Sequence, residues 1–188
     1  MATLVEDLVA QGVCTPEVVE AVKRQLAAGG GGRITDALAV LGWADERAVL
    51  RVMALRANTR FVTVEKLQGA KIEQSVLDRV PVRFCETHSA IPLKYDGPTQ
   101  ALLVAAADPA DQAFLMDLKV VSSLQNIVAL VALERGVQAA IRRFYYGDVT
   151  AFESLSKELK PVRAPAAVRD TQEASLSKIF KTPIPKPQ

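Results

Sequence analysis

The sequence predicts an α+β protein with three parts: an N-terminal four-helix lobe, a small α/β lobe with a mixed sheet, and a disordered tail. Three observations support this prediction. The first sixty residues form an internal repeat, because they match themselves at an offset of thirty. Between 61 and 147, continuous apolar runs alternate with segments of helical periodicity. After Gly147, this alternation of apolar and helical segments is lost. Because 188 residues suffice for one domain or two small ones, we place the parts at 1–60, 61–147 and 148–188.

The internal repeat predicts two tandem helix–turn–helix units. Each copy contains an apolar-periodic helix, a glycine at the end of that helix, a residue typical of N-caps, and a second helix. The matching pairs are Leu4 with Ile34, Glu6 with Asp36, Leu8 with Leu38, Gly12 with Gly42, Thr15 with Asp45, and Val19 with Val49. Helices this short are marginally stable alone, so their apolar stripes must pack against one another or against a second lobe.

Residues 61–147 predict strands and helices around a mixed sheet. The expected strands are β-prone or continuously apolar runs at 61–64, 90–95, 101–106 and 127–131. The expected helices span 72–80, 108–121 and 134–145, and the second of them directs Phe114, Leu115, Leu118 and Val121 inward. Pro92 has no amide proton to donate to a neighbouring strand, which favours an edge position or a strand start for 90–95.

The segment 148–188 is rich in proline, alanine and charged residues, a composition that predicts disorder. Within it, the run Ser-Leu-Ser-Lys that starts at Ser154 recurs at Ser175. One interpretation is chance similarity in a biased segment. The other is a pair of short amphipathic docking segments, 154–160 and 175–181, that fold on a protein partner.

Composition and charge exclude several functional classes. Lysine and arginine number 23 against 21 for aspartate and glutamate, and the net charge of +2 is too small for a dedicated binder of nucleic-acid polymers. No stretch reaches the ~18 apolar residues of a membrane span, and no secretory signal is visible. Cys14 and Cys85 are too few for a disulfide framework, so we expect reduced thiols and a cytoplasmic location.

The sequence contains no recognisable catalytic or metal-binding constellation. The sole histidine, His88, lies three residues after Cys85, but no orienting third group or oxyanion hole accompanies this pair. One histidine and two distant cysteines do not supply a zinc site. The glycine run 29–32 lacks the Lys-Ser/Thr of a phosphate-binding loop, so it indicates a helix end and a linker. We therefore expect a protein that is not an enzyme and holds no metal or resident cofactor.

Several segments, in their order and spacing, resemble a known family. They are Phe61-Val62-Thr63-Val64, Ala90-Ile91-Pro92-Leu93, the Ala-Asp-Pro helix start that ends at Pro109, and the Tyr-Gly that ends at Gly147. Together with the tandem repeat, they make residues 3–147 similar to the N-terminal domain of type II secretion and type IV pilus assembly ATPases, the GspE/PilB/MshE N-terminal domain. The ATPase half has no counterpart in the 188 residues, so the chain looks like a stand-alone copy of a regulatory domain.

The resemblance also implies a candidate ligand, because some members of this family bind cyclic di-GMP through the tandem motif. Arginine and glutamine side chains there address guanine and phosphate groups, and leucines form an apolar cradle. The corresponding ligand-binding positions of this sequence are Leu4, Leu8, Gly12, Gln25, Arg33, Ile34, Leu38, Gly42 and Arg56. The motif is degenerate, since Thr3 replaces an arginine, Thr35 replaces a glycine, and Arg56 stands where glutamine is expected.

These observations leave two functions open. The first is a regulatory or adaptor module that acts through protein–protein interaction, with a secretion or pilus-type ATPase or a motility regulator as partner. The alternative is a cyclic di-GMP sensor. A charge-assisted hydrogen bond contributes about 1.5–3 kcal/mol, so the arginine lost at Thr3 weakens ligand binding roughly ten- to hundredfold. We therefore favour the first function.

Overall fold

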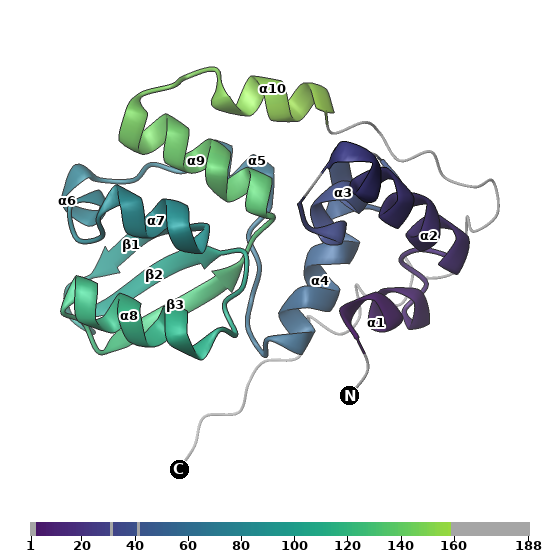
Figure 1. Cartoon of the computed structure of the whole chain (residues 1–188). Helices are drawn as coiled ribbons and strands as arrows, with labels where there is room; N and C mark the ends of the chain where they lie inside the picture. Colours follow the sequence, from purple (N-terminus) through teal and green to yellow (C-terminus); the bar gives the residue numbers. More distant parts are fainter. Residues whose placement is uncertain (1–2, 31, 41, 159–188) are drawn as a thin grey trace, which may run out of the picture.

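Two lobes lie side by side in the computed structural model, which describes residues 3–30, 32–40 and 42–158 (Figure 1). The first lobe consists of helices α1 to α4, and the second combines a three-stranded sheet with further helices. The architecture is α+β, as the sequence predicts. Within the described ranges, no helix is long and apolar enough to span a bilayer.

The helical lobe has the duplicated helices that the sequence predicts. They are α1 (Leu4–Ala10), α2 (Pro16–Gln25), α3 (Ile34–Val40) and α4 (Glu46–Arg56), and one turn of π-helix, η1 (Leu26–Gly30), follows α2. Thr15 and Asp45 begin α2 and α4 in the same way, because each side chain accepts a hydrogen bond from the amide three residues later.

The duplication extends to the turn inside each unit. Gly12 and Gly42 have φ angles of 69° and 68°, in the left-handed region that glycine adopts without a Cβ penalty. After each glycine the chain makes the same hydrogen bond: the amide of Val13 donates to the Leu8 carbonyl, and that of Trp43 to the Leu38 carbonyl, both at 2.9 Å. The turns of the two copies therefore have the same backbone structure.

The second lobe contains the mixed sheet that the sequence predicts. Its strands are β1 (Ala90–Asp96), β2 (Ala101–Ala106) and β3 (Asn126–Val131), in the order β1-β2-β3. β1 pairs antiparallel with β2, and β2 pairs parallel with β3. Strand β1 lies at an edge, as Pro92 predicts, and its register shifts just after this proline.

The helices of this lobe precede, connect and follow the strands. They are α5 (Val64–Gln68), α6 (Gln74–Leu77), α7 (Val82–His88), α8 (Gln112–Ser122) and α9 (Glu134–Tyr146). Helix α7 contacts α9 through Cys85 and Tyr145, whose Sγ and Oη atoms are 3.4 Å apart. It contacts α8 through the rings of Phe84 and Phe114, which stack with centroids 6.1 Å apart.

The strand predicted at 61–64 is wrong. Only Phe61 forms a bridge, with Val131 of β3. Thr63 then begins helix α5, where its hydroxyl accepts a hydrogen bond from the amide of Lys66. A threonine side chain that satisfies a helix N-terminus outweighs the β propensity of its neighbours here.

The helix predicted over 72–80 is confined to the four residues of α6. The hydroxyl of Tyr145 lies 3.2 Å from the Leu77 carbonyl oxygen and 2.8 Å from the Val80 carbonyl oxygen, within hydrogen-bonding distance of both. These carbonyls therefore have a partner from α9 in place of a further helical turn. The contact joins residues 65 to 68 positions apart, which no local pattern reveals.

Helix α8 begins later than predicted, at Gln112 instead of 108. The carboxylate of Asp111 accepts a hydrogen bond from the Ala113 amide and so sets the start of the helix. Phe114 and Leu118 are buried as predicted and Leu115 is half-buried, whereas Val121 is exposed to solvent.

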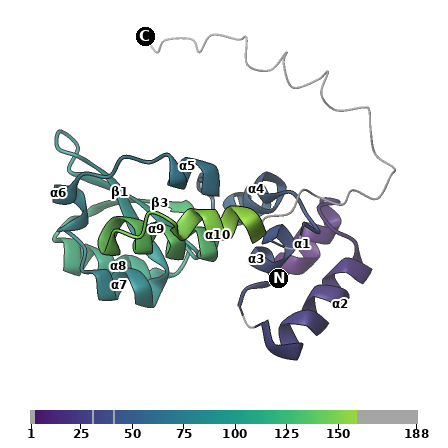
Figure 2. The ribbon, with the colours of Figure 1, turned by 90° about the horizontal axis from the view of Figure 1, so that it is seen from above.

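Helix α10 (Ala151–Glu158) lies inside the region that composition predicts to be disordered from 148 onward. It runs along α9 towards the helical lobe (Figure 2). Ala151, Phe152 and Leu155 are buried in this packing, so the folded part extends beyond Gly147. The first predicted docking segment, 154–160, overlaps this packed helix, and the second, 175–181, lies outside the described residues.

Helix α9 carries a glycine where α5 approaches it closely. A Cβ atom at Gly136 would lie 2.9 Å from Val64 Cγ2 and 3.5 Å from Leu67 Cδ1. Val64 and Leu67 are buried, so neither side chain can move into solvent to make room. The packing of α5 on α9 therefore depends on the missing side chain.

Replacing Gly136 with alanine will destabilise the protein by about 1–2 kcal/mol, because overpacking outweighs the gain in helix propensity. Urea unfolding followed by circular dichroism measures the change. Gly69→Ala is the matched control, since the nearest atom to a Cβ there is the Glu65 carbonyl oxygen at 3.6 Å. Equal free energies of unfolding for the two variants would contradict this account of the α5–α9 contact.

Candidate functional site

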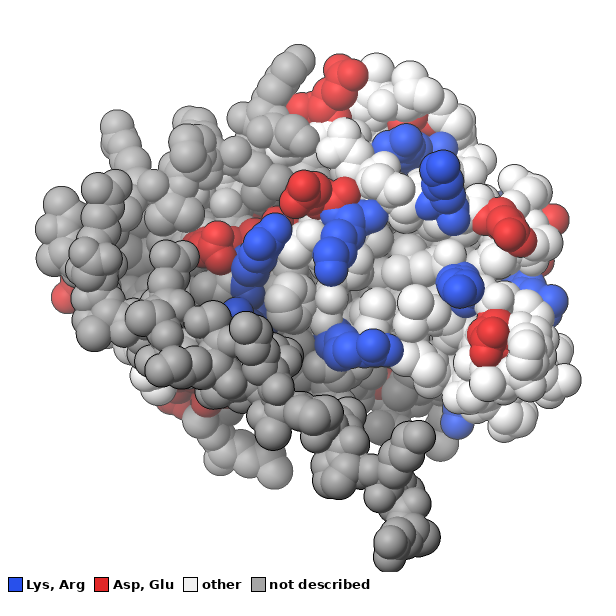
Figure 3. Space-filling model, turned by 180° about the vertical axis from the view of Figure 1, so that it is seen from behind, with Lys and Arg blue, Asp and Glu red and all other residues white. Residues whose placement is uncertain are grey.

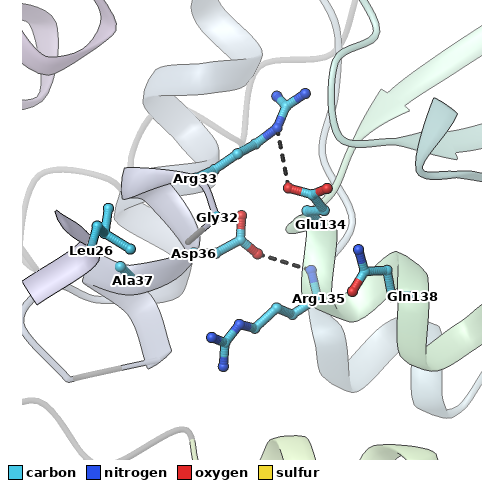
Figure 4. Close-up of a pocket in the computed structure, with 8 residues that line it drawn as sticks. All are labelled: Leu26, Gly32, Arg33, Asp36, Ala37, Glu134, Arg135 and Gln138. Atoms are coloured by element: carbon cyan, nitrogen blue, oxygen red, sulfur yellow. Dashed lines mark hydrogen bonds and ion pairs between the residues drawn. The ribbon is translucent and has the colours of Figure 1, made fainter. Parts of the chain in front are cut away.

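The two lobes meet around Arg33, which directly precedes α3. Its Nε atom is 3.3 Å from Glu134 Oε2 at the start of α9, and its Nη1 donates to the Ala107 carbonyl at 3.2 Å. Asp108 Oδ2 lies 4.0 Å from Nη1. Arg33, the motif arginine of the second repeat, thus binds the α/β lobe of its own chain (Figure 4).

Asp36, one turn later in α3, makes the second contact between the lobes. Its Oδ1 accepts a hydrogen bond of 3.0 Å from the backbone amide of Arg135. The residue at the N-cap of α9 is Leu133, which has no polar side chain to offer, so Asp36 supplies the cap from the other lobe. The side chain is 4% exposed, and Oδ2 has no hydrogen-bond partner.

The burial of Asp36 alters its acidity. Desolvation is the largest effect and raises the pKa of this carboxyl group to about 6. The hydrogen bond from the Arg135 amide lowers the pKa, and the negative charge of Glu134 raises it. The positive charges of Arg33 and Arg135 lower it. The protonated form is therefore favoured in the folded state over a pH range in which an exposed aspartate is ionised.

These residues line a pocket of about 290 Å³ between the lobes (Figure 4). Leu26, Gly32 and Ala37 complete its helical-lobe side, and Gln138 of α9 faces them. The pocket offers carboxylate oxygens from Glu134 and hydrogen-bond donors from arginine and amide groups. It can therefore hold a polar group that both donates and accepts hydrogen bonds.

A second pocket, of about 260 Å³, gathers three of the predicted ligand positions: Leu4, Arg33 and Arg56. Met53 also lines it, and the chain from Ala107 to Ala110 forms part of the opposite wall. Arg56 Nη1 is 2.6 Å from Asp7 Oδ2, so this arginine also has a partner within the chain. The pocket thus combines two guanidinium groups with apolar walls.

The other predicted ligand positions lie elsewhere. Leu8 and Leu38 are fully buried in the core, and Gly12 and Gly42 form the tight turns described above. Ile34 is half-buried in α3, and Gln25 is exposed at the end of α2, outside both pockets. Ligand binding by these nine positions stays a prediction.

Asp36, Glu134 and Gln138 were not among the predicted site residues. One signal in the sequence points to Asp36, because it is the single charged residue in the otherwise apolar and small stretch of α3. No comparable signal exists for Glu134, whose contact with Arg33 joins residues about a hundred positions apart.

The Cys85 and His88 pair does not have the geometry of a nucleophile and its base. Cys85 is fully buried, and desolvation raises the pKa of its thiol to about 11. The His88 ring packs on Phe84 and Phe114, with centroids 4.5 and 5.6 Å away. Across the described part of the chain, no group of three or more His, Cys, Asp or Glu residues could hold a metal ion.

Charges of both signs share the face turned away from the viewer of Figure 1. Where this face is described, lysines and arginines lie among acidic and uncharged side chains and do not merge into one basic field (Figure 3). A protein that binds duplex nucleic acid by contacting the phosphate backbone uses one continuous basic surface. The distribution on this face agrees with the low net charge of the chain.

The fold is shared with proteins of known structure. Residues 61–151 match the sequence model of the MshEN domain. The structure of MshE with cyclic di-GMP aligns with a TM-score of 0.56 at 20% identity, over 77% of this chain and 100% of that one. The N-terminal domain of XpsE aligns with a TM-score of 0.52 at 19% identity, over 74% and 92%. No curated protein matches the chain in sequence.

The structural likeness covers a larger share of the chain than the α/β lobe provides, so it includes the helical lobe. The family match, in contrast, leaves out residues 1–60, where the tandem motif lies. At identities near 20%, the likeness shows a common fold.

Asp36→Asn will change the pH dependence of stability. Because the pKa of Asp36 is higher in the folded protein than in the unfolded chain, ionisation of this carboxyl group lowers the free energy of unfolding. This loss is absent below about pH 4, grows as pH rises, and is complete above about pH 6. Relative to Asp36→Asn, the native protein should lose about 3 kcal/mol of unfolding free energy between pH 4 and pH 8.

Chemical denaturation at intervals of pH measures this difference. Asp117→Asn makes the same substitution at an exposed position of α8 and controls for the change of side chain itself. A difference between the native protein and Asp36→Asn that stays constant from pH 4 to pH 8 would refute the assigned burial effect.

Proposed function

We propose that this protein is a non-catalytic regulatory adaptor that acts by binding another protein. The match of residues 61–151 to the MshEN domain supports this proposal. The observation that carries this proposal is the engagement of Arg33. Its guanidinium group is bonded to Glu134 and to the Ala107 carbonyl, and Arg56 is paired with Asp7. These two arginines of the second repeat therefore serve the internal structure of the protein.

The engagement of Arg33 disfavours a small ligand in energetic terms. A ligand that takes the guanidinium must replace its contacts with Glu134 and Ala107, so only the difference between old and new contacts contributes to affinity. Thr3, at the arginine position of the first repeat, offers no charge to compensate. Every 1.4 kcal/mol lost in this exchange weakens binding about tenfold.

The reactive side chains described above also support a non-catalytic role. The thiol of Cys85 is buried and kept protonated, and the ring of His88 packs among aromatic side chains. The adaptor acts in the cytoplasm, and its partner is a secretion or pilus-type ATPase or a motility regulator. Its contact surface is the helical lobe, where Leu55 is 65% exposed and Trp43 is 43% exposed.

A second candidate function is a cyclic di-GMP sensor, which one arrangement favours. Leu4, Arg33, Met53 and Arg56 line one pocket, and this combination of apolar walls with two guanidinium groups suits a guanine base and its phosphate. MshE, of the same fold, has been solved with cyclic di-GMP.

We expect the purified protein to bind the assembled secretion or pilus ATPase of the same organism. Biolayer interferometry measures the affinity. Leu55→Asp will weaken this binding at least about tenfold, because a charge at an exposed apolar anchor removes its burial. Val149→Asp is the matched control, since Val149 is an exposed apolar residue outside the helical lobe. An affinity that Leu55→Asp and Val149→Asp reduce equally would count against the helical lobe as the contact surface.

Isothermal titration with cyclic di-GMP separates the two functions. The adaptor proposal predicts no heat of binding up to near-millimolar ligand, because Arg33 and Arg56 are already paired. Measurable binding would instead favour the sensor, and Arg33→Ala should then weaken it by about 1.5–3 kcal/mol. Arg56→Gln, which restores the residue expected from the motif, should strengthen binding only if the sensor candidate is correct.

A further inference from the structure

Strand β3 lies at one edge of the sheet (Figure 1), so half of its backbone groups point away from β2. The amide of Ala132, directly after β3, donates to the Ala106 carbonyl of β2 at 3.0 Å. Alternate residues of a strand direct their backbone groups to the same side, so every second residue before Ala132 also faces β2. Ile127, Ala129 and Val131 therefore direct their amides and carbonyls away from the sheet. We call the backbone of these three residues the outer β3 edge.

The segment between α4 and α5 closes the C-terminal end of the outer β3 edge. The amide of Val131 donates to the Arg60 carbonyl at 2.9 Å, and its carbonyl accepts a hydrogen bond of 2.8 Å from the Val62 amide. The carbonyl of Ala129 accepts a hydrogen bond of 2.6 Å from the Thr59 hydroxyl. The chain therefore pairs this edge from the Ala129 carbonyl onward.

The N-terminal half of the outer β3 edge is open. Within the described part of the chain, no hydrogen-bond partner exists for the amide and carbonyl of Ile127 or for the amide of Ala129. Ile127, Val128 and Ala129 are half-buried, so solvent reaches this stretch. Open donors and acceptors along a strand are the groups with which a further strand pairs.

The two edges of the sheet differ in their protection against pairing with a further strand. β1 contains Pro92, which has no amide proton, the charged residues Lys94 and Asp96, and a register shift directly after the proline. β3 contains neither a proline nor a charged residue, and its register with β2 is continuous over all six residues. An unprotected apolar edge promotes aggregation unless something covers it. The contrast favours β3 as a surface that a partner covers.

A pocket of about 390 Å³ lies beside the outer β3 edge and extends it towards the helical lobe. It is lined by Ala54, Leu55, Asn58, Thr59 and Arg60. Thr59 is the residue whose hydroxyl contacts β3, and Leu55 is 65% exposed. The side chain of Arg60 is exposed and forms no ion pair within the described ranges. A strand on this edge can therefore place an apolar side chain against Leu55 and an acidic side chain near Arg60.

We propose that the outer β3 edge is the docking site for an extended segment of the protein partner, which adds to the sheet as a further strand. The proposal rests on the adaptor function proposed above and specifies how the partner is recognised. The backbone of the segment pairs with Ile127 and with the amide of Ala129. Its apolar and acidic side chains contact Leu55 and Arg60. Backbone pairing contributes affinity, and the pocket contributes specificity.

Amide hydrogen exchange of the full chain, alone and bound to the assembled secretion or pilus ATPase of the same organism, tests the proposal. After exchange, the complex is dissociated in acid and the amides are read by NMR. Binding should slow the exchange of the Ile127 and Ala129 amides at least about tenfold, because each amide gains an acceptor. The amide of Val128 faces β2 and is already bonded in the free chain, so its exchange should change much less.

A proline at the open edge tests the same pairing by affinity. Ile127→Pro removes the outward amide and leaves the hydrogen bonds to β2 in place. Ile127→Ala is the matched control, because it also removes the isoleucine side chain but keeps the amide. In biolayer interferometry, Ile127→Ala should bind the ATPase at least about tenfold more tightly than Ile127→Pro. Circular dichroism checks the fold of both variants, and the exchange measurement on the native chain decides if Ile127→Pro does not fold.

The outcomes separate this proposal from the adaptor function. If the native chain does not bind the ATPase, the adaptor function and this proposal both fail. Binding that leaves the exchange of the Ile127 and Ala129 amides unchanged would overturn docking at β3 alone, as would equal affinities of two folded variants, Ile127→Pro and Ile127→Ala. Protection of these amides in the free chain that increases with its concentration would assign the edge to a second copy and also overturn the proposal.

Discussion

The contacts of Arg33 and Asp36 with the start of helix α9 set the position of the helical lobe against the α/β lobe. Their counterparts in the first repeat are Thr3 and Glu6, which form a capping box within α1: each accepts a hydrogen bond from the other's backbone amide. The same two positions therefore close a helix end in one copy and join two lobes in the other. Divergence at these polar positions, with the apolar stripe kept, gives the two copies different tasks.

This junction is held at a cost in stability. Asp36 Oδ2 and Thr35 Oγ1 are both buried without a hydrogen-bond partner, and each such group costs about 1–3 kcal/mol. Proteins retain arrangements of this kind where the position serves more than packing. Any movement that separates the lobes returns Asp36 to water and releases Arg33 at the same time. The placement of the lobes, the protonation of Asp36 and the availability of Arg33 are thus linked.

Features written into short stretches of sequence could be predicted, and features made by distant residues could not. The paired glycines and N-caps of the repeat, and the edge position of Pro92, follow from local chemistry. The hydrogen bond from the Arg135 amide to Asp36 joins residues 99 positions apart. It exists because the two lobes pack together, and no local sequence pattern indicates it. In the same way, the motif predicted Arg33 as a candidate residue, but its partners on α9 and directly after β2 lie far along the chain.

The two cysteines lie one in each lobe. Cys14 follows the turn after α1 and Cys85 lies in α7; both are buried, and desolvation raises the pKa of both thiols. The thiolate that reacts with alkylating reagents is therefore scarce while a lobe stays closed. Each lobe therefore contains one cysteine whose alkylation reports local unfolding of that lobe. Mass spectrometry measures the mass that the reagent adds at that residue. The order in which the two residues become labelled distinguishes lobes that open together from lobes that open separately.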